Sequence, residues 1–295
     1  MSHGEMPKLK PRSFEYIRAE SLEDVFQVLD EQGDEAKIIA GGQSLMAAMN
    51  MRFAAPETLV DVADIIEMRG IHLNGDMLRI GAMSRHSEVL ASEDVATHAP
   101  IIFQAMPQIA HPAIRNRGTF GGSLCNADPA SELPACALAA QAIFNIQSSV
   151  GSRSVAAVDF LEGTYATCLK ANEVLISVDV PIATANTRTF FDEVARRHGD
   201  FAMAGIAAQA EISGGVIGQA SLVYFAVSEM ALRSDAASAM IEGQRIDDLD
   251  VEAVCDALAI DIHPFEDLTT SGEAKMHLLK VLTRRALAAL TDGQG

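Results

Sequence analysis

The sequence contains few cysteines, and none of them lies in a metal-binding pattern. The four cysteines are Cys125, Cys136, Cys168 and Cys255. No two have Cys-x-x-Cys spacing, and no histidine lies at zinc-finger spacing from any of them. The sequence therefore predicts no metal site and no iron–sulfur cluster on this chain, and it favours reduced, buried thiols.

Positive charge is also scarce. The chain has 22 lysines and arginines against 40 aspartates and glutamates, which gives a net charge of −18. A protein that binds duplex nucleic acid needs a basic face to neutralise phosphates, so this balance argues against such a function. The densest basic stretch, "RRHGD" at residues 196–200, is short, and we interpret it as a solvated cluster.

Long apolar runs are missing as well. No segment reaches the roughly 20 apolar residues that a membrane-spanning helix needs. The first residues, "MSHGEMPKLKPRSF", lack the apolar core of a secretory signal. Hydrophobic residues make up 49% of the chain and charged residues 21%, which is typical of a globular protein with a substantial core. The sequence therefore predicts a cytoplasmic protein without a membrane span.

The common nucleotide-binding motifs do not occur. The sequence has no G-x-G-x-x-G turn after a predicted strand and no G-x-x-x-x-G-K-[ST] loop. If the chain binds a dinucleotide, it therefore does so through neither a Rossmann turn nor a P-loop.

Strand and helix signals alternate in the first 60 residues. A chain of 295 residues is longer than most single domains, so two or three lobes are expected. "SLEDVFQVLDEQ" (21–32) has apolar residues at helical spacing after an N-cap serine. The strands "KIIA" (37–40) and "ETLVDVAD" (57–64) follow. Residues 1–60 are therefore predicted to form a small α/β lobe.

The remaining pattern divides near residue 185. Hairpins are predicted at residues 71–83, around Asn74-Gly75, and at 142–157, and a strand at 173–181, so that residues 61–182 form a β-rich lobe. "ATANTRT" (183–189) has the composition of a linker. Two long strands at 203–228 and helices near 234–242, 251–259 and 272–290 predict a third unit over residues 186–292.

Two double-glycine segments share a local pattern. Gly41-Gly42 is followed by Gln43, Ser44 and Leu45, and Gly121-Gly122 is followed by Ser123 and a second leucine. Glycine permits positive φ and close approach of a ligand, and successive backbone N–H groups can bind an anion. One such turn is more simply a chain reversal. Two turns with the same polar residues favour a shared diphosphate between them.

Three motifs resemble a known family. "AGGQSLMAAMNMR" (40–52), "HPAIRNRGTFGGSLCNADPASELPA" (111–135) and "FFDEVARRHGDFAMAG" (190–205) are similar to those of the FAD-binding medium subunits of the molybdenum hydroxylases, of the carbon monoxide, xanthine and nicotine dehydrogenase type. The resemblance covers nearly the whole chain. It implies an α+β fold: a two-lobed FAD-binding domain of the vanillyl-alcohol oxidase and p-cresol methylhydroxylase type, then a smaller domain with an antiparallel sheet and helices.

The resemblance also implies which residues hold FAD. The first segment would line one side of the cofactor with backbone amides on the diphosphate, and the second would grip it from the other side. Asn126 and Asp128 would hydrogen-bond along the adenosine and pyrophosphate portion, and Leu175 would pack near the adenine. Glu132 stands where relatives often carry an aspartate that can hold the adenosine ribose. The implied residues of the two segments are Ile39, Ala40, Gly41, Gly42, Gln43, Ser44, Leu45, Thr119, Gly121, Gly122 and Ser123.

Several of these residues have simpler explanations. Asn126 and Asp128 could form a turn, and Glu132 could be an exposed acid at a helix N-terminus, where the dipole favours it. We interpret His111 and His198 as surface or capping residues. Some relatives place a lysine near the flavin before the "RRxGDFA" run, and Asp192 is taken to occupy that position here, which would change the contacts at the flavin edge.

The function implied by the resemblance is electron transfer. A large partner subunit would hold the molybdopterin cofactor, a small partner two [2Fe–2S] clusters, and this chain FAD, in a dimer of heterotrimers. The flavin carries the redox chemistry, so no catalytic side chain is expected on this chain. Three alternatives stay open: a self-sufficient FAD oxidase or dehydrogenase of the same fold, a scaffold without FAD, and a different nucleotide-binding module.

Overall fold

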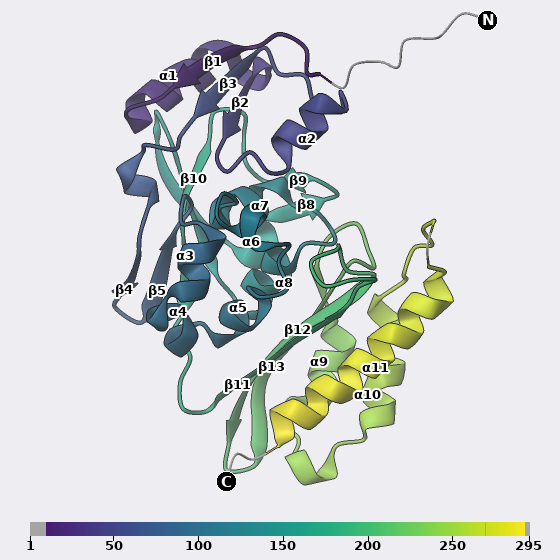
Figure 1. The fold of residues 1–295 in the computed structure, drawn as a ribbon. Coiled ribbons are helices and arrows are strands. Elements are labelled where there is room, and N and C mark those ends of the chain that lie inside the picture. The colour runs from purple at the N-terminus through teal and green to yellow at the C-terminus, as the bar shows by residue number, and fades with distance from the viewer. Residues whose placement is uncertain (1–9, 269, 293–295) are drawn as a thin grey trace, which may run out of the picture.

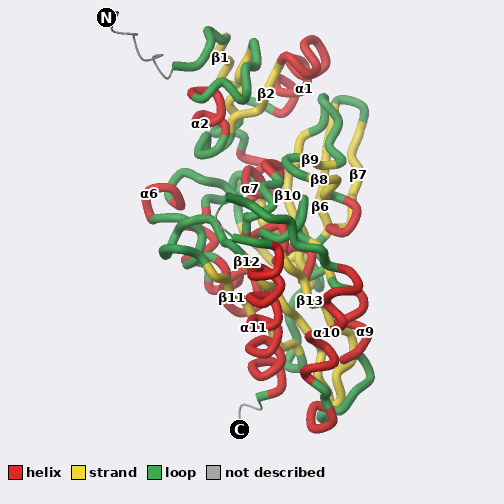
Figure 2. The backbone as a smooth tube through the Cα atoms, turned by 90° about the vertical axis from the view of Figure 1, so that its right-hand side faces the viewer, coloured by secondary structure: helices red, strands yellow, loops and turns green. Residues whose placement is uncertain are grey.

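The described residues form four sheets, and the three larger ones organise the chain into three lobes (Figure 1). The computed structural model describes residues 10–268 and 270–292. We call residues 15–61 the N-terminal lobe, residues 66–181 the middle lobe and residues 187–291 the C-terminal lobe. Figure 2 shows them in that order from the top of the molecule to its base. Within the described residues, no helix is long and apolar enough to cross a membrane.

The N-terminal lobe is a parallel three-stranded sheet with strand order β1-β3-β2. The crossover helix α1 begins after Ser21, which forms a capping box with Asp24, and it ends at Gly33. The predicted helix and both predicted strands are confirmed. The elements are β1 (Glu15–Arg18), α1 (Leu22–Gln32), η1 (Gly33–Glu35), β2 (Ala36–Ile39), α2 (Leu45–Asn50) and β3 (Thr58–Asp61).

The middle lobe contains an antiparallel sheet of order β4-β5-β10-β6-β7, covered by short helices. Both predicted hairpins and the predicted strand at 173–181 are present. The strands are β4 (Ile71–Asn74), β5 (Met77–Gly81), β6 (Ile143–Ser148), β7 (Gly151–Ala156), β10 (Val174–Pro181) and the small pair β8 (Leu161–Gly163) and β9 (Ala166–Thr167). The helices are η2 (Ile66–Met68), α3 (His86–Ala91), α4 (Glu93–His98), α5 (Pro100–Ala105), α6 (Pro112–Arg115), α7 (Phe120–Asn126), α8 (Glu132–Ala139) and η3 (Ala157–Asp159).

The C-terminal lobe is an antiparallel sheet of order β11-β12-β13-β14, and the helices α9, α10 and α11 cover one of its faces. Strand alternation gives the sheet two apolar faces: Ile206 packs against the helices, whereas Ala207 packs into the core of the middle lobe, where α5 and α8 lie on the sheet. The elements are β11 (Thr187–Val194), β12 (Ala204–Ser213), β13 (Val216–Phe225), β14 (Leu232–Arg233), α9 (Asp235–Ile241), η4 (Ile246–Asp248), α10 (Val251–Asp261) and α11 (Gly272–Thr291).

The predicted α+β class is confirmed, but the second double-glycine segment is not a turn. Gly121 and Gly122 lie in the first turn of α7, and neither has positive φ. Thr119 caps this helix by accepting a hydrogen bond from the backbone N–H of Gly122, at 3.2 Å. Glycine is needed here for close packing, since a Cβ on Gly121 would lie 2.5 Å from that of Ala82.

Candidate functional site

The two double-glycine segments meet at one place, between the N-terminal and middle lobes. A Cβ on Gly41 would lie 2.3 Å from the carbonyl oxygen of Arg117 and 2.8 Å from the Cα of Gly118. Real Cβ atoms do not approach backbone so closely, so only glycine permits this contact. The structure therefore brings together the two segments that the sequence paired.

The first segment presents unpaired backbone donors. It leaves β2 at Ile39, turns at Gly42 with φ of 71°, and enters α2 after Ser44. Within the described chain, the N–H groups of residues 41–44 donate to no acceptor. The Gln43 amide holds the turn by donating to the carbonyl of Gly41 at 2.8 Å. Such a run of free N–H groups is the donor set expected for an anion.

The second segment uses its amides to anchor itself. The N–H of Phe120 donates to the carbonyl of Ser84, and that of Gly121 to the carbonyl of Ala82, both at 2.8 Å. The hydroxyl of Ser123 is shared with that of Ser131 at 3.0 Å. Free backbone amides are therefore found in the first segment, whereas those of residues 120–123 are bonded within the chain. The second can offer the hydroxyl proton of Thr119, whose oxygen already accepts from Gly122.

Two cavities adjoin the contact between the segments. One, of about 460 Å³, lies over the first segment and includes Ile39, Gln43 and Met46 in its wall. The other, of about 180 Å³, lies on the side of Thr119. Ala40 and Gly41 belong to both walls, so the two cavities adjoin at the double glycine, and we call them together the cleft.

Three arginines line the smaller cavity, and the sequence analysis did not identify them as site residues. Arg69, Arg85 and Arg117 line it, and all three are exposed at its mouth. The cavity also contains the acids Asp61 and Glu88. In a chain of net charge −18, three cations at one opening are unusual and favour an anionic ligand. Only Arg117 carried a signal, because it lies within the second motif at residues 111–135.

The sequence analysis also did not identify a buried histidine, His86, next to the second segment. His86 begins α3 at 5% exposure, and its Nε2 lies 2.9 Å from the carbonyl oxygen of Thr119. A carbonyl only accepts, so Nε2 carries the proton and Nδ1, which is buried, has no partner. Burial lowers the pKa of His86 to about 4. The ring is therefore neutral at physiological pH and fixes the backbone of the second segment.

Three other residues predicted to contact the cofactor, Asn126, Asp128 and Leu175, lie in α7, just after it, or in the strand that packs on it. Asn126 ends α7, and Asp128 follows it with one carboxylate oxygen on the N–H of Ala130 at 2.9 Å and the other on the Tyr165 hydroxyl at 3.0 Å. These bonds support the simpler interpretation of Asp128 as a turn residue. Leu175 is buried in β10, which packs on α7, and lines neither cavity.

One acidic prediction needs correction, and the structure shows the surroundings of a second acid, Asp192. Glu132 begins α8 as expected, but it is only 7% exposed, so the interpretation as an exposed helix-terminal acid is wrong. The carboxylate of Asp192 accepts a hydrogen bond from Arg285 of α11 at 2.9 Å. It therefore points towards the C-terminal helices, and the next residue, Glu193, faces the middle lobe instead.

The structure agrees with the interpretation of the histidines and, in part, with that of the cysteines. His111 and His198 are exposed, and neither has a resolved partner in the cleft. All four cysteines are free; Cys136 and Cys255 are buried, whereas the other two are partly exposed. The described residues contain no group of side chains that could hold a metal ion.

Comparison with known proteins identifies both parts of the chain. The family described as "FAD binding domain in molybdopterin dehydrogenase" matches residues 12–183. The family described as "CO dehydrogenase flavoprotein C-terminal domain" matches residues 189–290. Together these matches include both double-glycine segments and the third motif.

Individual relatives match along almost their entire length. The carbon monoxide dehydrogenase medium chain of Hydrogenophaga pseudoflava is 34% identical over 279 residues, which cover 95% of this chain and 97% of the relative. The caffeine dehydrogenase subunit beta of Pseudomonas sp. (strain CBB1) is 35% identical over 288 residues, with 96% and 97% covered. A solved carbon monoxide dehydrogenase from Hydrogenophaga pseudoflava superimposes with a TM-score of 0.92 at 36% identity, covering 95% of this chain and 98% of the other.

Proposed function

The chain belongs to the family of FAD-binding medium subunits of the molybdenum hydroxylases, and from this premise we propose that it transfers electrons through FAD. It would accept them from [2Fe–2S] clusters on a small partner and pass them to an external acceptor. A large partner with the molybdopterin cofactor would hydroxylate the substrate. The observation that carries the proposal is the single cleft where the two glycine segments meet.

The residues of the cleft fit an FAD diphosphate. Free N–H groups at residues 41–44 and the hydroxyl of Thr119 supply neutral donors, and Arg117 supplies charge. Ile39 and Met46 give the larger cavity an apolar wall. FAD supplies the electron chemistry when bound, whereas this chain binds it, orients it and tunes its surroundings. No side chain needs to act as nucleophile or general acid.

The proposal includes finer assignments. We assign the cofactor contacts to the two glycine segments together with Asn126, Asp128, Glu132 and Leu175. We also propose domain boundaries at 1–60, 61–182 and 186–292, a cytoplasmic location, and assembly as a dimer of heterotrimers. Relatives are named as medium chains or subunits of larger dehydrogenases, which supports partner dependence.

Replacing Gly41 tests the cleft directly. Gly41→Val should weaken FAD binding by roughly tenfold or more in Kd, because its Cβ would force the Arg117 segment away. Gly218→Val is the matched control, since a Cβ there meets only Glu211, with its carbonyl oxygen at 3.3 Å and its Cβ at 3.9 Å, in the sheet of the C-terminal lobe. Flavin titration by fluorescence measures both, with circular dichroism as a check on folding. Undiminished FAD affinity in Gly41→Val would contradict the proposed clamp.

A further inference from the structure

The loop between α7 and α8, residues 127–131, is built around strained backbone. Ala127 has φ of 46°, a left-handed value that residues other than glycine rarely adopt. Two residues that bond to this loop share that property: Tyr165 has φ of 54° and Ala226 has φ of 65°. Such conformations cost free energy and persist only where the surrounding contacts enforce them, and they are concentrated at functional sites. The contacts around these three residues therefore show how the loop is held in place.

On the side of the middle lobe, Tyr165 holds the loop twice. Tyr165 lies at the tip of the hairpin formed by β8 and β9. Its backbone N–H donates to the carbonyl of Ala127 at 3.1 Å, and its hydroxyl donates to Oδ2 of Asp128 at 3.0 Å. The neighbouring Thr164 hydroxyl donates to the carbonyl of Glu229 at 3.1 Å, which ties the same hairpin to the C-terminal lobe. The first half of the loop is therefore fixed by both backbone and side chain.

On the side of the C-terminal lobe, Ala226 holds the loop through its backbone. It directly follows β13, and its N–H donates to the carbonyl of Pro129 at 2.8 Å. Its carbonyl accepts a hydrogen bond from Nζ of Lys275 in α11, at 3.0 Å. Both polar groups of Ala226 are therefore engaged, one towards the loop and one towards the helix. These two bonds fix the left-handed conformation of Ala226.

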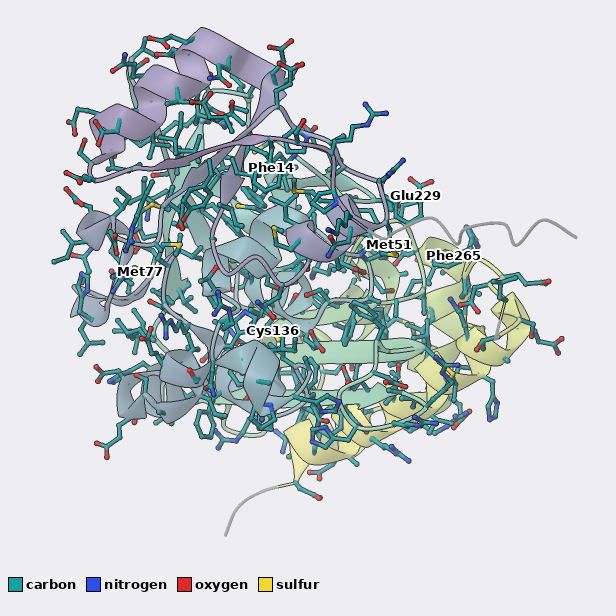
Figure 3. The ribbon with its side chains drawn as sticks, turned by 45° about the horizontal axis from the view of Figure 1, so that its top comes forward. Phe14, Met51, Met77, Cys136, Glu229 and Phe265 are labelled. Carbon is teal, nitrogen blue, oxygen red and sulfur yellow. The ribbon has the colours of Figure 1, made fainter. Side chains whose placement is uncertain are left out.

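Lys275 is itself a rigid anchor. It is 1% exposed, and its Nζ pairs with the carboxylate of Asp267 at 2.7 Å and lies 4.0 Å from the centre of the Phe265 ring. Figure 3 shows Phe265 and Glu229, each in a loop of the C-terminal lobe, towards the right of the molecule. A hydrogen bond from an ionised donor is roughly twice as strong as one between neutral groups, so the ammonium holds the Ala226 carbonyl firmly.

The loop adjoins the proposed cofactor site. It carries Asp128, a proposed contact, and ends at Ser131, whose hydroxyl shares a 3.0 Å hydrogen bond with that of Ser123 in the second glycine segment. The N–H of Ser131 donates to the carbonyl of Asp128 at 3.0 Å, which braces the loop internally. Neither Ala226 nor Lys275 lines either cavity. Any effect of these two residues on the cofactor must therefore pass through the loop.

We propose that Lys275 is a positioning residue for the cofactor site. It fixes Ala226, and Ala226 fixes the loop at 127–131 in the conformation that binds FAD. This inference rests on the proposed function. A loop that is already ordered loses less conformational entropy when a ligand binds, so the affinity for FAD depends on a cation outside the cleft. The C-terminal lobe thereby contributes to cofactor binding, although none of its described residues lines the cavities.

The first test needs no flavin. Hydrogen exchange measured by mass spectrometry on the FAD-free chain compares Lys275→Met with Thr283→Val. Thr283 is the matched control, because it is buried on the same helix and bonds the Tyr224 hydroxyl at 2.7 Å, so valine weakens the C-terminal core without touching Ala226. The amides at 130–131 and 226 should exchange roughly tenfold faster in Lys275→Met than in wild type, and within about twofold of wild type in Thr283→Val.

Wild-type exchange in Lys275→Met, or equal acceleration in both variants, would overturn the hold on the loop. If Lys275→Met does not fold by circular dichroism, Asp267→Asn replaces it, because it removes the charge that pairs with the same ammonium. The loop amides should then exchange about threefold faster than in wild type, and unchanged exchange would contradict the proposal.

The second test measures FAD affinity by fluorescence titration. Lys275→Met should raise Kd by about tenfold, whereas Thr283→Val should stay within about twofold of wild type. Tyr165→Phe removes the bond to Asp128 from the other side of the loop, and it should raise Kd by about threefold. Equal affinity in Lys275→Met and wild type would refute the link to the cofactor, as would an equal loss in Lys275→Met and Thr283→Val.

The outcomes separate this inference from the proposed function. A wild-type chain that binds no FAD would refute the proposed function, while the exchange result would still decide whether Lys275 holds the loop. FAD binding that depends on Gly41 but not on Lys275 would leave the proposed function standing and refute this inference.

Discussion

At Gly41, a hydrogen atom in place of a side chain sets the distance between two loops. The carbonyl of Arg117 occupies the space that any Cβ would need. That contact lies where the two cavities share their wall, next to the N–H groups of residues 41–44, which have no acceptor in the described chain. Gly121 and Gly122 serve a different purpose, because they let α7 pack closely on Ala82 and on the Thr119 cap.

His86 predicts a loss of stability in acid. Its pKa is about 4 in the folded chain and 6.5 when unfolded, so the stabilising contribution of the neutral ring is present above pH 6.5 and is lost as pH falls towards 4. Relative to His86→Asn, wild type should lose about 2 kcal/mol of unfolding free energy between pH 7 and pH 5. Urea unfolding at both pH values measures this difference.

The control for His86 is another histidine that does not contact the second segment. His111 is exposed, so His111→Asn should keep the acid sensitivity of wild type. Equal pH dependence in wild type and His86→Asn would contradict the neutral, Nε2-protonated ring. It would also remove the reason to regard His86 as a support of the Thr119 backbone.

At the scale of elements, α11 contains a buried cation that joins a loop to the C-terminal core. Lys275 is 1% exposed. Its Nζ donates to the carbonyl of Ala226 at 3.0 Å and pairs with Asp267 at 2.7 Å. The same Nζ lies 4.0 Å from the centre of the Phe265 ring. Removing it leaves a buried carbonyl without a donor.

Lys275→Met should therefore destabilise the chain by about 3 kcal/mol. The matched control is Lys280→Met on the same helix, whose pair with Asp256 at 2.6 Å is largely exposed and should change stability by about 0.5 kcal/mol or less. Denaturant unfolding followed by circular dichroism compares the two variants. Equal losses would show that Lys275 does not join the loop to the core.

Periodicity predicted elements whose partners are local. Helix α1 and the hairpin of β4 and β5 follow directly from apolar spacing and from Asn74-Gly75. Helix α7 was missed because Gly121-Gly122 is typical of a turn, and its stability comes from the Thr119 cap and from packing on Ala82. The cap is a local contact, whereas the packing on Ala82 is a tertiary contact, and tertiary contacts override local propensity.

At the candidate site, too, the sequence predicted local features and missed contacts between residues far apart in the chain. The glycine segments could be paired from their shared pattern, whereas His86 is 33 residues from its partner Thr119. Lys275 likewise resembles a solvated helix residue until the loop at 263–268 and Ala226 surround it. The orientation of Asp192 and Glu193 depended on which face of β11 meets the middle lobe, and the sequence alone did not distinguish them.

At the scale of the whole molecule, the chain has the cofactor-binding part of a redox system and no metal site of its own among the described residues. Because relatives are named as medium chains or subunits of dehydrogenases, we predict a partner-dependent protein. Purification from its own host, under the inducing substrate, should recover it with molybdenum- and iron–sulfur-containing chains, and native mass spectrometry should show a dimer of heterotrimers. A lone chain under those conditions would favour a self-sufficient flavoenzyme, which substrate-dependent bleaching of its flavin would identify.

The central claim is that this chain binds FAD in the cleft between its glycine segments. Its most direct test is to release the ligand from the natively purified protein by heat and to identify it by chromatography and mass spectrometry. We predict FAD at one molecule per chain, and its absence from Gly41→Val but not from Gly218→Val. A colourless preparation that takes up no FAD, or a different nucleotide in the extract, would contradict the account.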